Sequence, residues 1–390
     1  MIRNIILFFF LFYLVEGRSQ QVVHDRKSQI RVEIENIMNR LDVIGLAVVV
    51  VDKGQIIYRE SFGYKSFDTY MKHGKEPLRD EHIFRIASIS KTFVATAIFQ
   101  LIDQDLLNLE DDVNHYLDFH VANPNYPDVP ITIKMLLSHR SSINDSQGYF
   151  SFNHINPEKG KNYCLCYNDY APGKGYQYCN YNYNLLGAII ENISGERFDD
   201  YIEKYITSRL KLKGSYNVER LDRALLVPLY KYDKKEKCFQ EQPEAYKSYK
   251  KLLENYKLGM YASYLSPTGG MKISAGDLAK YMMIHMQNGK YGRERFISSK
   301  SEKLIRKVVT PEAAYALSFK EYQGLIPGEK LCGQTGGAYG LFSAMIFHPE
   351  KKYGFVVITN GCNSIAIDGY QDLHKSVIKC LYNNLIKRER

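Results

Sequence analysis

The sequence has no tryptophan and only seven cysteines in 390 residues. Because these cysteines are sparse and odd in number, a small fold held together by disulfides is excluded, and sequence alone does not pair them. Cys164 and Cys166 form a Cys-x-Cys pair without a second such pair or nearby histidines. No metal site is therefore expected.

A strong charge of one sign is also missing. The net charge is +9, and the lysines are scattered among acidic residues. This pattern is typical of a solvated surface, so no nucleic-acid partner is expected. Apolar residues make up 45% of the chain and charged residues 24%, as in soluble globular proteins. The length allows one composite domain or two modest ones.

The N-terminal apolar run is too short to span a bilayer comfortably. It extends from Ile5 to Val15, follows the basic Arg3 and precedes small and polar residues, which is typical of a signal peptide. We expect a signal peptide at residues 1–19 and a mature chain at 20–390 that is secreted or periplasmic. No stable membrane span is expected after cleavage. A signal anchor is the alternative.

Apolar periodicity predicts the order of the elements. Helices are expected within 24–41, 84–104, 131–139, 183–206 and 367–387, and strands within 45–64, 340–349 and 353–360. The segments 147–178 and 230–256 read as irregular insertions.

The predicted order places a hairpin and a helix at each end of the chain. The simplest packing joins both ends in one antiparallel sheet flanked by helices. We therefore expect an α/β fold of the α+β type. Its sheet part would cover about 28–80 and 325–390, and an inserted, mostly helical subdomain would cover about 85–300.

The stretch "FRIASISKTFVATAIFQLIDQ" combines a helical apolar stripe with Ser88 and Lys91 in its first turns. A serine hydroxyl needs a base to become nucleophilic, and the two residues are neighbours on a helix. A lysine amine, with an ordinary pKa of ~10.4, becomes such a base when burial lowers that pKa. The alternative is that Ser88 caps the helix and Lys91 reaches the surface.

Two later motifs accompany this pair in chain order. Tyr178-Cys179-Asn180 precedes a helix, and Gln334-Thr335-Gly336-Gly337 opens a strand. The combination of Ser-x-x-Lys, Tyr-x-Asn and a polar residue before Thr-Gly resembles the serine β-lactamase and penicillin-binding-protein superfamily. The similar branch comprises class C β-lactamases, D-alanyl-D-alanine carboxypeptidases, D-aminopeptidases and esterases. The resemblance covers roughly Ile44 to Thr359.

The resemblance implies a role for each matching residue. Ser88 would be the acylated nucleophile, Lys91 would assist its deprotonation, and Tyr178 would be a second proton shuttle. Asn180 would orient Lys91 and bind the substrate amide. The segment Gln334, Thr335, Gly336 and Gly337 would bind substrate, with the N–H groups of Ser88 and Gly337 as the oxyanion hole. No metal or cofactor is implied.

Gln334 departs from the family pattern, because lysine or histidine usually stands there. Glutamine carries no charge, so we expect neutral esters to be hydrolysed better than penicillins or peptides ending in D-alanine, unless Arg85 holds the carboxylate. His139 is expected to be structural. Cys179 is expected to be a packing residue, with a nucleophilic thiol as the alternative.

These observations predict an exported serine hydrolase that acts through an acyl-enzyme on a small-molecule or peptide substrate. The substrate would be an amide or ester, either a D-amino-acid peptide or a small ester. A class C-like β-lactamase is the alternative enzyme. The alternative of another class is a catalytically silent relative that binds peptidoglycan or a partner.

Overall fold

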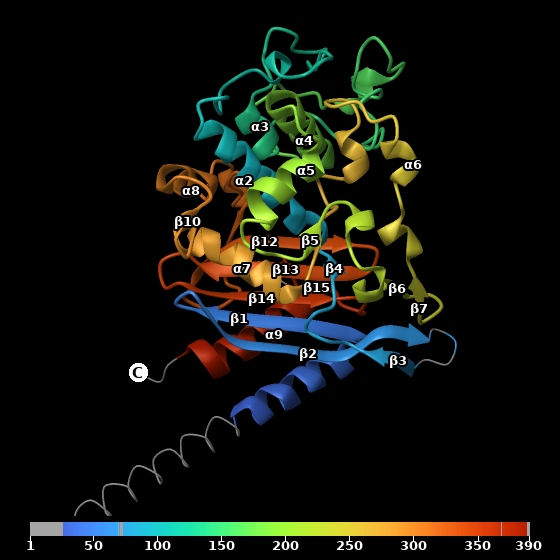
Figure 1. The fold of residues 1–390 in the computed structure, drawn as a ribbon, viewed down its shortest axis with the longest axis vertical. Coiled ribbons are helices and arrows are strands. Elements are labelled where there is room, and N and C mark those ends of the chain that lie inside the picture. The colour runs from blue at the N-terminus through green and yellow to red at the C-terminus, as the bar shows by residue number, and fades with distance from the viewer. Residues whose placement is uncertain (1–25, 69, 71–72, 368, 388–390) are drawn as a thin grey trace, which may run out of the picture.

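The computed structural model describes residues 26–68, 70, 73–367 and 369–387, and the predicted signal peptide lies outside them. The centre is a seven-stranded antiparallel sheet in the order β11-β12-β13-β14-β1-β2-β3 (Figure 1). The two chain ends meet where β14 pairs with β1. The predicted fold class is therefore confirmed. The strands are β1 (Gly45–Asp52), β2 (Gln55–Asp68), β3 (His73–Pro77), β11 (Lys320–Gln323), β12 (Lys330–Ala338), β13 (Leu341–His348) and β14 (Tyr353–Thr359).

The first predicted hairpin forms as expected. Its turn places Lys53 and Gly54 at φ values of +48° and +81°. Positive φ at both central residues matches the right-handed twist of the flanking strands, and glycine adopts it without strain. The predicted hairpin between β13 and β14 is also present.

Both faces of the sheet are covered by helices. On one face, Val48 and Val50 of β1 share a core with the helix at 26–40 and with α9 (Asp372–Leu381). On the other face, Val49 and Val51 belong to the larger core that contains α2 (Ser90–Ile102) and α7 (Ala275–Met286). Because successive side chains point to opposite faces, burial of both faces explains the unbroken apolar run of β1.

The helix predicted at 84–104 is shorter than expected and is not amphipathic. Residues 84–85 form a strand, β4, residues 87–89 form a 3-10 turn, and α2 begins only at Ser90. Every residue from Ser90 to Leu101 is buried. The reason is tertiary, because α2 packs against α4 (Asn180–Ser194), α5 (Phe198–Ile202) and α8 (Ser299–Ile305). Among the described residues no helix is both long and apolar enough to cross a membrane.

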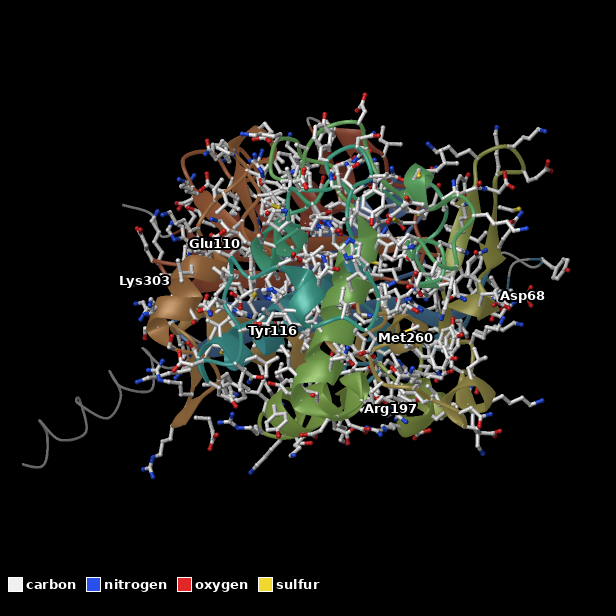
Figure 2. The ribbon with its side chains drawn as sticks, turned by 90° about the horizontal axis from the view of Figure 1, so that it is seen from above. Asp68, Glu110, Tyr116, Arg197, Met260 and Lys303 are labelled. Atoms are coloured by element: carbon white, nitrogen blue, oxygen red, sulfur yellow. The ribbon has the colours of Figure 1, made fainter. Side chains whose placement is uncertain are left out.

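Helices α3 to α5 and α9 lie close to the predicted helices at 131–139, 183–206 and 367–387, whereas α6, α7 and α8 were not predicted. Gly195, at φ +68°, ends α4 where a break was expected. Seen from above, Asp68 and Lys303 lie at opposite sides of the molecule (Figure 2). The other helices are α3 (Ile133–Leu137), α4 (Asn180–Ser194), α5 (Phe198–Ile202), α6 (Lys250–Leu253) and α8 (Ser299–Ile305).

The expectation of an irregular segment at 230–256 is wrong, because β6 and β7 form a hairpin there and α6 follows. Alternating side chains on either side of a lysine-rich turn are sufficient for a short hairpin. The short strands are β4 (Phe84–Arg85), β5 (Gly214–Ser215), β6 (Tyr230–Asp233), β7 (Cys238–Glu241), β8 (Lys272–Ile273), β9 (Lys290–Tyr291), β10 (Glu294–Arg295), β15 (Ala366–Ile367) and β16 (Tyr370–Gln371).

Candidate active site

Ser88 lies in the 3-10 turn that joins β4 to α2. The preceding Ala87 has φ +47°, a left-handed conformation that is strained for a residue with a side chain. Neighbouring elements hold this turn in place, because Ile86 donates its N–H to Met271 O at 3.0 Å and accepts from Ser343 Oγ at 2.9 Å. The hydroxyl of Ser88 is thus presented from a fixed backbone.

Lys91 is completely buried beside Ser88. Its Nζ lies 3.2 Å from Ser88 Oγ, 2.9 Å from Asn180 Oδ1 and 2.8 Å from the carbonyl oxygen of Thr268. Burial lowers the pKa of the Lys91 amine to about 7, against the opposing charge of Asp145. A substantial fraction of Lys91 is therefore neutral near pH 7.

The neutral form of Lys91 has the geometry of a base. A neutral amine has two N–H groups, and the amide oxygen of Asn180 and the carbonyl of Thr268 can only accept them. The lone pair of the amine is then left for the Ser88 hydroxyl, which stands at hydrogen-bond distance.

Tyr178 borders the same two residues. The centroid of its ring lies 4.9 Å from Lys91 Nζ, and 38% of the residue is exposed. Protein atoms crowded around the hydroxyl raise its pKa through desolvation, and a hydrogen bond with Ser88 only partly opposes this. The Tyr178 phenol is therefore protonated at neutral pH, which suits a proton donor more than a resting base.

Asn180, the first residue of α4, is oriented by Asp145, a residue that sequence reasoning missed. Both its N–H and its Nδ2 donate to Asp145 Oδ2 at 2.9 Å, and Tyr181 N–H donates to Asp145 Oδ1 at 3.0 Å. The carboxylate thus satisfies the exposed start of the helix and turns the Asn180 amide oxygen toward Lys91.

Strand β12 forms another wall of the site. A Cβ added at Gly336 would lie 2.4 Å from Ile86 O, so only glycine allows the strand to approach the Ser88 turn this closely. Ser88, Tyr178, Thr335, Gly336 and Gly337 all line one pocket with a volume of about 330 Å³. The three sequence motifs are thus brought together.

Gln334 also lines this pocket, but its amide is already engaged. Its Nε2 donates to Tyr315 OH and to Ser318 O, both at 3.0 Å, and its Oε1 accepts from Thr335 N–H at 3.0 Å. Because both donor hydrogens are taken, Gln334 has no free N–H for a substrate carboxylate. The Gln334 side chain, which was expected to bind substrate, therefore has no hydrogen-bond donor available for it in this arrangement.

His139 and Cys179 are hydrogen-bonded to each other beside the site. His139 Nδ1 accepts the Cys179 N–H at 3.2 Å, and burial lowers the pKa of this imidazole well below its usual range. Burial also raises the pKa of the Cys179 thiol well above its usual range, and the thiol donates to Asp145 Oδ1 at 3.2 Å. A nucleophilic thiolate is disfavoured accordingly.

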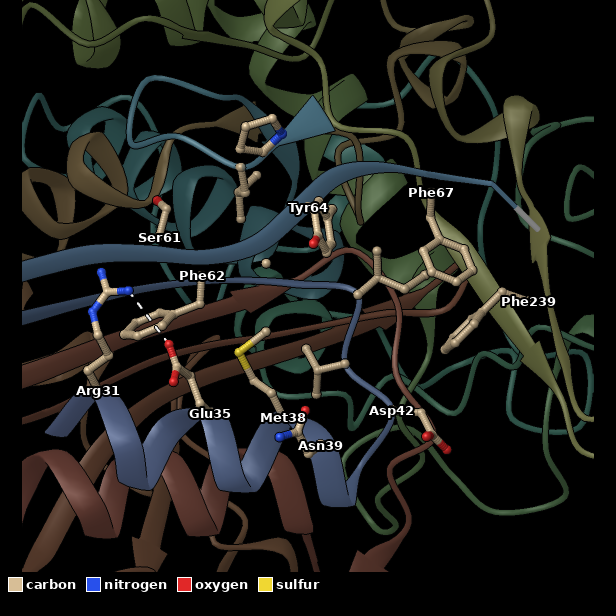
Figure 3. Close-up of a pocket in the computed structure, with 15 residues that line it drawn as sticks. Arg31, Glu35, Met38, Asn39, Asp42, Ser61, Phe62, Tyr64, Phe67 and Phe239 are labelled. Atoms are coloured by element: carbon tan, nitrogen blue, oxygen red, sulfur yellow. Dashed lines mark ion pairs between the residues drawn. The ribbon is translucent and has the colours of Figure 1, made fainter. Parts of the chain in front are cut away.

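A second cavity, of about 580 Å³, lies between the helix at 26–40, β2 and β7 (Figure 3). Its walls include Met38, Phe62, Phe67 and Phe239, with the ion pair of Arg31 and Glu35 at one side. None of the three motifs reaches it, so it brings no nucleophile and base together.

Two further features bear on the chemistry of the chain. All seven cysteines are free thiols. Across the described part of the chain, no group of three or more histidine, cysteine, aspartate or glutamate side chains is arranged to hold a metal ion.

Comparison of the sequence with protein families and with known proteins identifies one family model that matches this chain. The family model described as Beta-lactamase matches residues 31–374. "Penicillin-binding protein 4*" of Bacillus subtilis (strain 168) is 32% identical over 167 residues, which are 41% of this chain and 35% of that protein. "Protein flp" of Staphylococcus aureus (strain MRSA252) is 29% identical over 186 residues, 47% of this chain and 36% of that protein. The matches thus span about a third of these relatives.

Solved structures share the fold over nearly the whole chain. An octameric penicillin-binding protein homologue from Pyrococcus abyssi has a TM-score of 0.70 at 24% identity, covering 93% of this chain and 77% of that one. EstCE1, a hydrolase with promiscuous acyltransferase activity, has a TM-score of 0.71 at 19% identity, covering 92% and 99%. The D-amino acid amidase from Ochrobactrum anthropi SV3, complexed with L-phenylalanine amide, has a TM-score of 0.66 at 18% identity, covering 93% and 97%.

Proposed function

The chain belongs to the beta-lactamase family, and from that premise we propose that it is an exported serine hydrolase that forms an acyl-enzyme on Ser88. Its substrates are amides or esters, namely a D-amino-acid peptide or a small ester. The observation that carries this proposal is the buried Lys91 amine, whose pKa of about 7 and 3.2 Å distance from Ser88 Oγ provide a base for the nucleophile.

The residues divide the reaction between them. Ser88 Oγ attacks the substrate carbonyl while its proton passes to neutral Lys91. The oxyanion accepts from the N–H groups of Ser88 and Gly337, and losing one such donor costs roughly 10²–10³ in turnover. Tyr178 gives its proton to the leaving amine or alcohol and regains one by way of Lys91. Water then attacks the acyl-enzyme, and the proton it loses is returned to Ser88.

Intact mass of the protein and release of product, measured after separate incubation with a fluorophosphonate, a penicillin, a peptide ending in D-Ala-D-Ala and a small ester, test this function. We expect a stable fluorophosphonate adduct and release of product from the peptide or from a small ester. Rapid turnover of penicillin would instead identify a class C-like β-lactamase. A folded protein that forms no adduct and turns over none of these compounds would be the catalytically silent relative.

The rate of acylation should rise with pH through a midpoint near pH 7. Lys91 accepts a proton only when neutral, and its neutral fraction grows as the pH rises through its pKa of about 7. The measurement is the second-order rate constant for fluorophosphonate inactivation between about pH 5 and pH 9. The control, Tyr178→Phe, should lower the rate but keep the midpoint. A flat profile, or a midpoint in the carboxylate range near 4, would contradict Lys91 as the base.

Export rests on the sequence of residues 1–19. The mature protein is then residues 20–390, with the sheet part and the helical subdomain as one unit. The N-terminal mass of protein recovered outside the cytoplasm measures the cleavage, and a start at residue 1 would contradict it.

A further inference from the structure

The pocket that holds Ser88 has an unbalanced charge. Its lining contains no carboxylate side chain and one lysine, Lys320. A positive charge without a neighbouring negative one attracts anions, and a partly enclosed, low-dielectric pocket strengthens that attraction.

The other cationic side chains near the site, Arg85 and Lys91, form hydrogen bonds with protein atoms. Arg85 donates its Nε to Gly269 O and its Nη1 to Ala245 O, both at 2.9 Å. Lys91 is held by Ser88, Asn180 and Thr268. Arg85, the sequence-based alternative for holding a carboxylate, does not line this pocket.

Lys320 is the first residue of the edge strand β11, where it pairs with Gly333, the neighbour of Gln334. Its Nζ lies 5.8 Å from the centroid of the Tyr322 ring, and among the described residues it has no ion pair. The next residue, Glu321, pairs with Lys330 at 2.9 Å on the other face of the strand. The Lys320 ammonium is thus available to a ligand on the side of the pocket.

A second polar side chain of the pocket has an unpaired ring nitrogen. His374, at the start of α9, is 3% exposed, and its Nε2 has no hydrogen bond within the described part of the chain. Buried polar atoms are rarely left unsatisfied in folded proteins. Because burial lowers the pKa of His374 to about 4, its imidazole is neutral at pH 7, and a ring N–H could donate to an anion.

We propose that Lys320 determines substrate specificity by binding a free carboxylate of the substrate, with His374 lining the same pocket. The inference rests on the proposed acyl-enzyme function. It reverses the expectation drawn from Gln334, because the charge missing from β12 is supplied by the adjacent strand, ~4.8 Å away. The four-carbon side chain of lysine is flexible, so an ammonium group that starts from β11 can reach a ligand lying beside β12. The substrate class is then a peptide or related amide with a free carboxylate.

The test compares kcat/KM for two matched substrates that differ only in a free or methylated carboxylate. In Lys320→Met we expect about a tenfold loss for the free carboxylate, the range of a charge-assisted hydrogen bond, and little change for the methyl ester. The control Lys330→Met removes a lysine of β12 that pairs with Glu321 and does not line the pocket. It should leave the ratio of the two substrates unchanged.

Failure of this inference is distinguishable from failure of the proposed function. Lys320→Met should be labelled by a neutral fluorophosphonate as fast as the unaltered protein, because Ser88 and Lys91 are untouched. If labelling proceeds and the substrate ratio does not move, Lys320 does not bind the carboxylate. If the unaltered protein is not labelled at all, the acyl-enzyme function itself is wrong.

Discussion

Ser88→Ala is expected to abolish labelling by a fluorophosphonate and to lower turnover by a factor on the order of 10⁶. Neither Ser90 nor Cys179, the neighbouring candidates, is expected to replace it. Ser90 is fully buried, and its Oγ accepts the Met271 N–H at 3.0 Å. The Cys179 thiol, whose pKa burial raises, stays protonated. The measurement is peptide mapping of the labelled protein.

The matched control for that experiment is Ser90→Ala, two positions away in the same stretch. It should keep the adduct on the Ser88 peptide, although losing the hydrogen bond to Met271 lowers stability by about 1 kcal/mol. An adduct on Ser90 or Cys179 would contradict the assignment of Ser88 as the nucleophile. A loss of labelling in both variants would point to disturbance of the turn and not to the nucleophile.

Much of the fold could be predicted from the sequence where local chemistry decides it. The turn at Lys53-Gly54 needs positive φ, which the sequence signals directly, and the apolar runs of β1, β13 and β14 require burial wherever they lie. The bounds of α2 could not be predicted. Its surroundings come from α4, α5 and α8, elements distant in the chain, and they bury the face that periodicity assigned to solvent.

The candidate site shows the same division. Ser88, Lys91, Tyr178 and Asn180 stand out because each motif is compact and their order along the chain is specific. Asp145 could not be found in this way, because its four hydrogen bonds to residues 179–181 reach across about 35 positions of sequence.

Gln334 stands out in the sequence as a departure from the family pattern, yet the partners of its side chain could not be foreseen. The partners that occupy its amide, Tyr315 and Ser318, lie on the segment before β11. The same segment leads into Lys320. The family motif on β12 therefore shows that Gln334 carries no charge, but it gives no information about Lys320 on the neighbouring strand.

Lys91 and Tyr178 should behave as one proton-transfer unit. A positioned acid or base contributes roughly 10²–10⁴ in rate, and residues that act together give losses that do not multiply. Lys91→Ala and Tyr178→Phe should each remove most of the acylation rate, and the double variant should be little slower than either one. The measurement is a double-mutant cycle on the single-turnover rate of acylation.

The geometry explains why the losses overlap. Ser88 Oγ and Lys91 Nζ lie at hydrogen-bond distance, 3.2 Å apart. The centroid of the Tyr178 ring lies 4.9 Å from the same Nζ. Without Lys91, the phenol loses the group that restores its proton, and its raised pKa makes it a poor source of tyrosinate. Because Lys91 is completely buried, Lys91→Ala also leaves a cavity. Lys91→Met fills most of that space but cannot take up a proton, so it separates lost packing from lost chemistry. Losses that multiply in both cycles would show that Lys91 and Tyr178 serve separate steps.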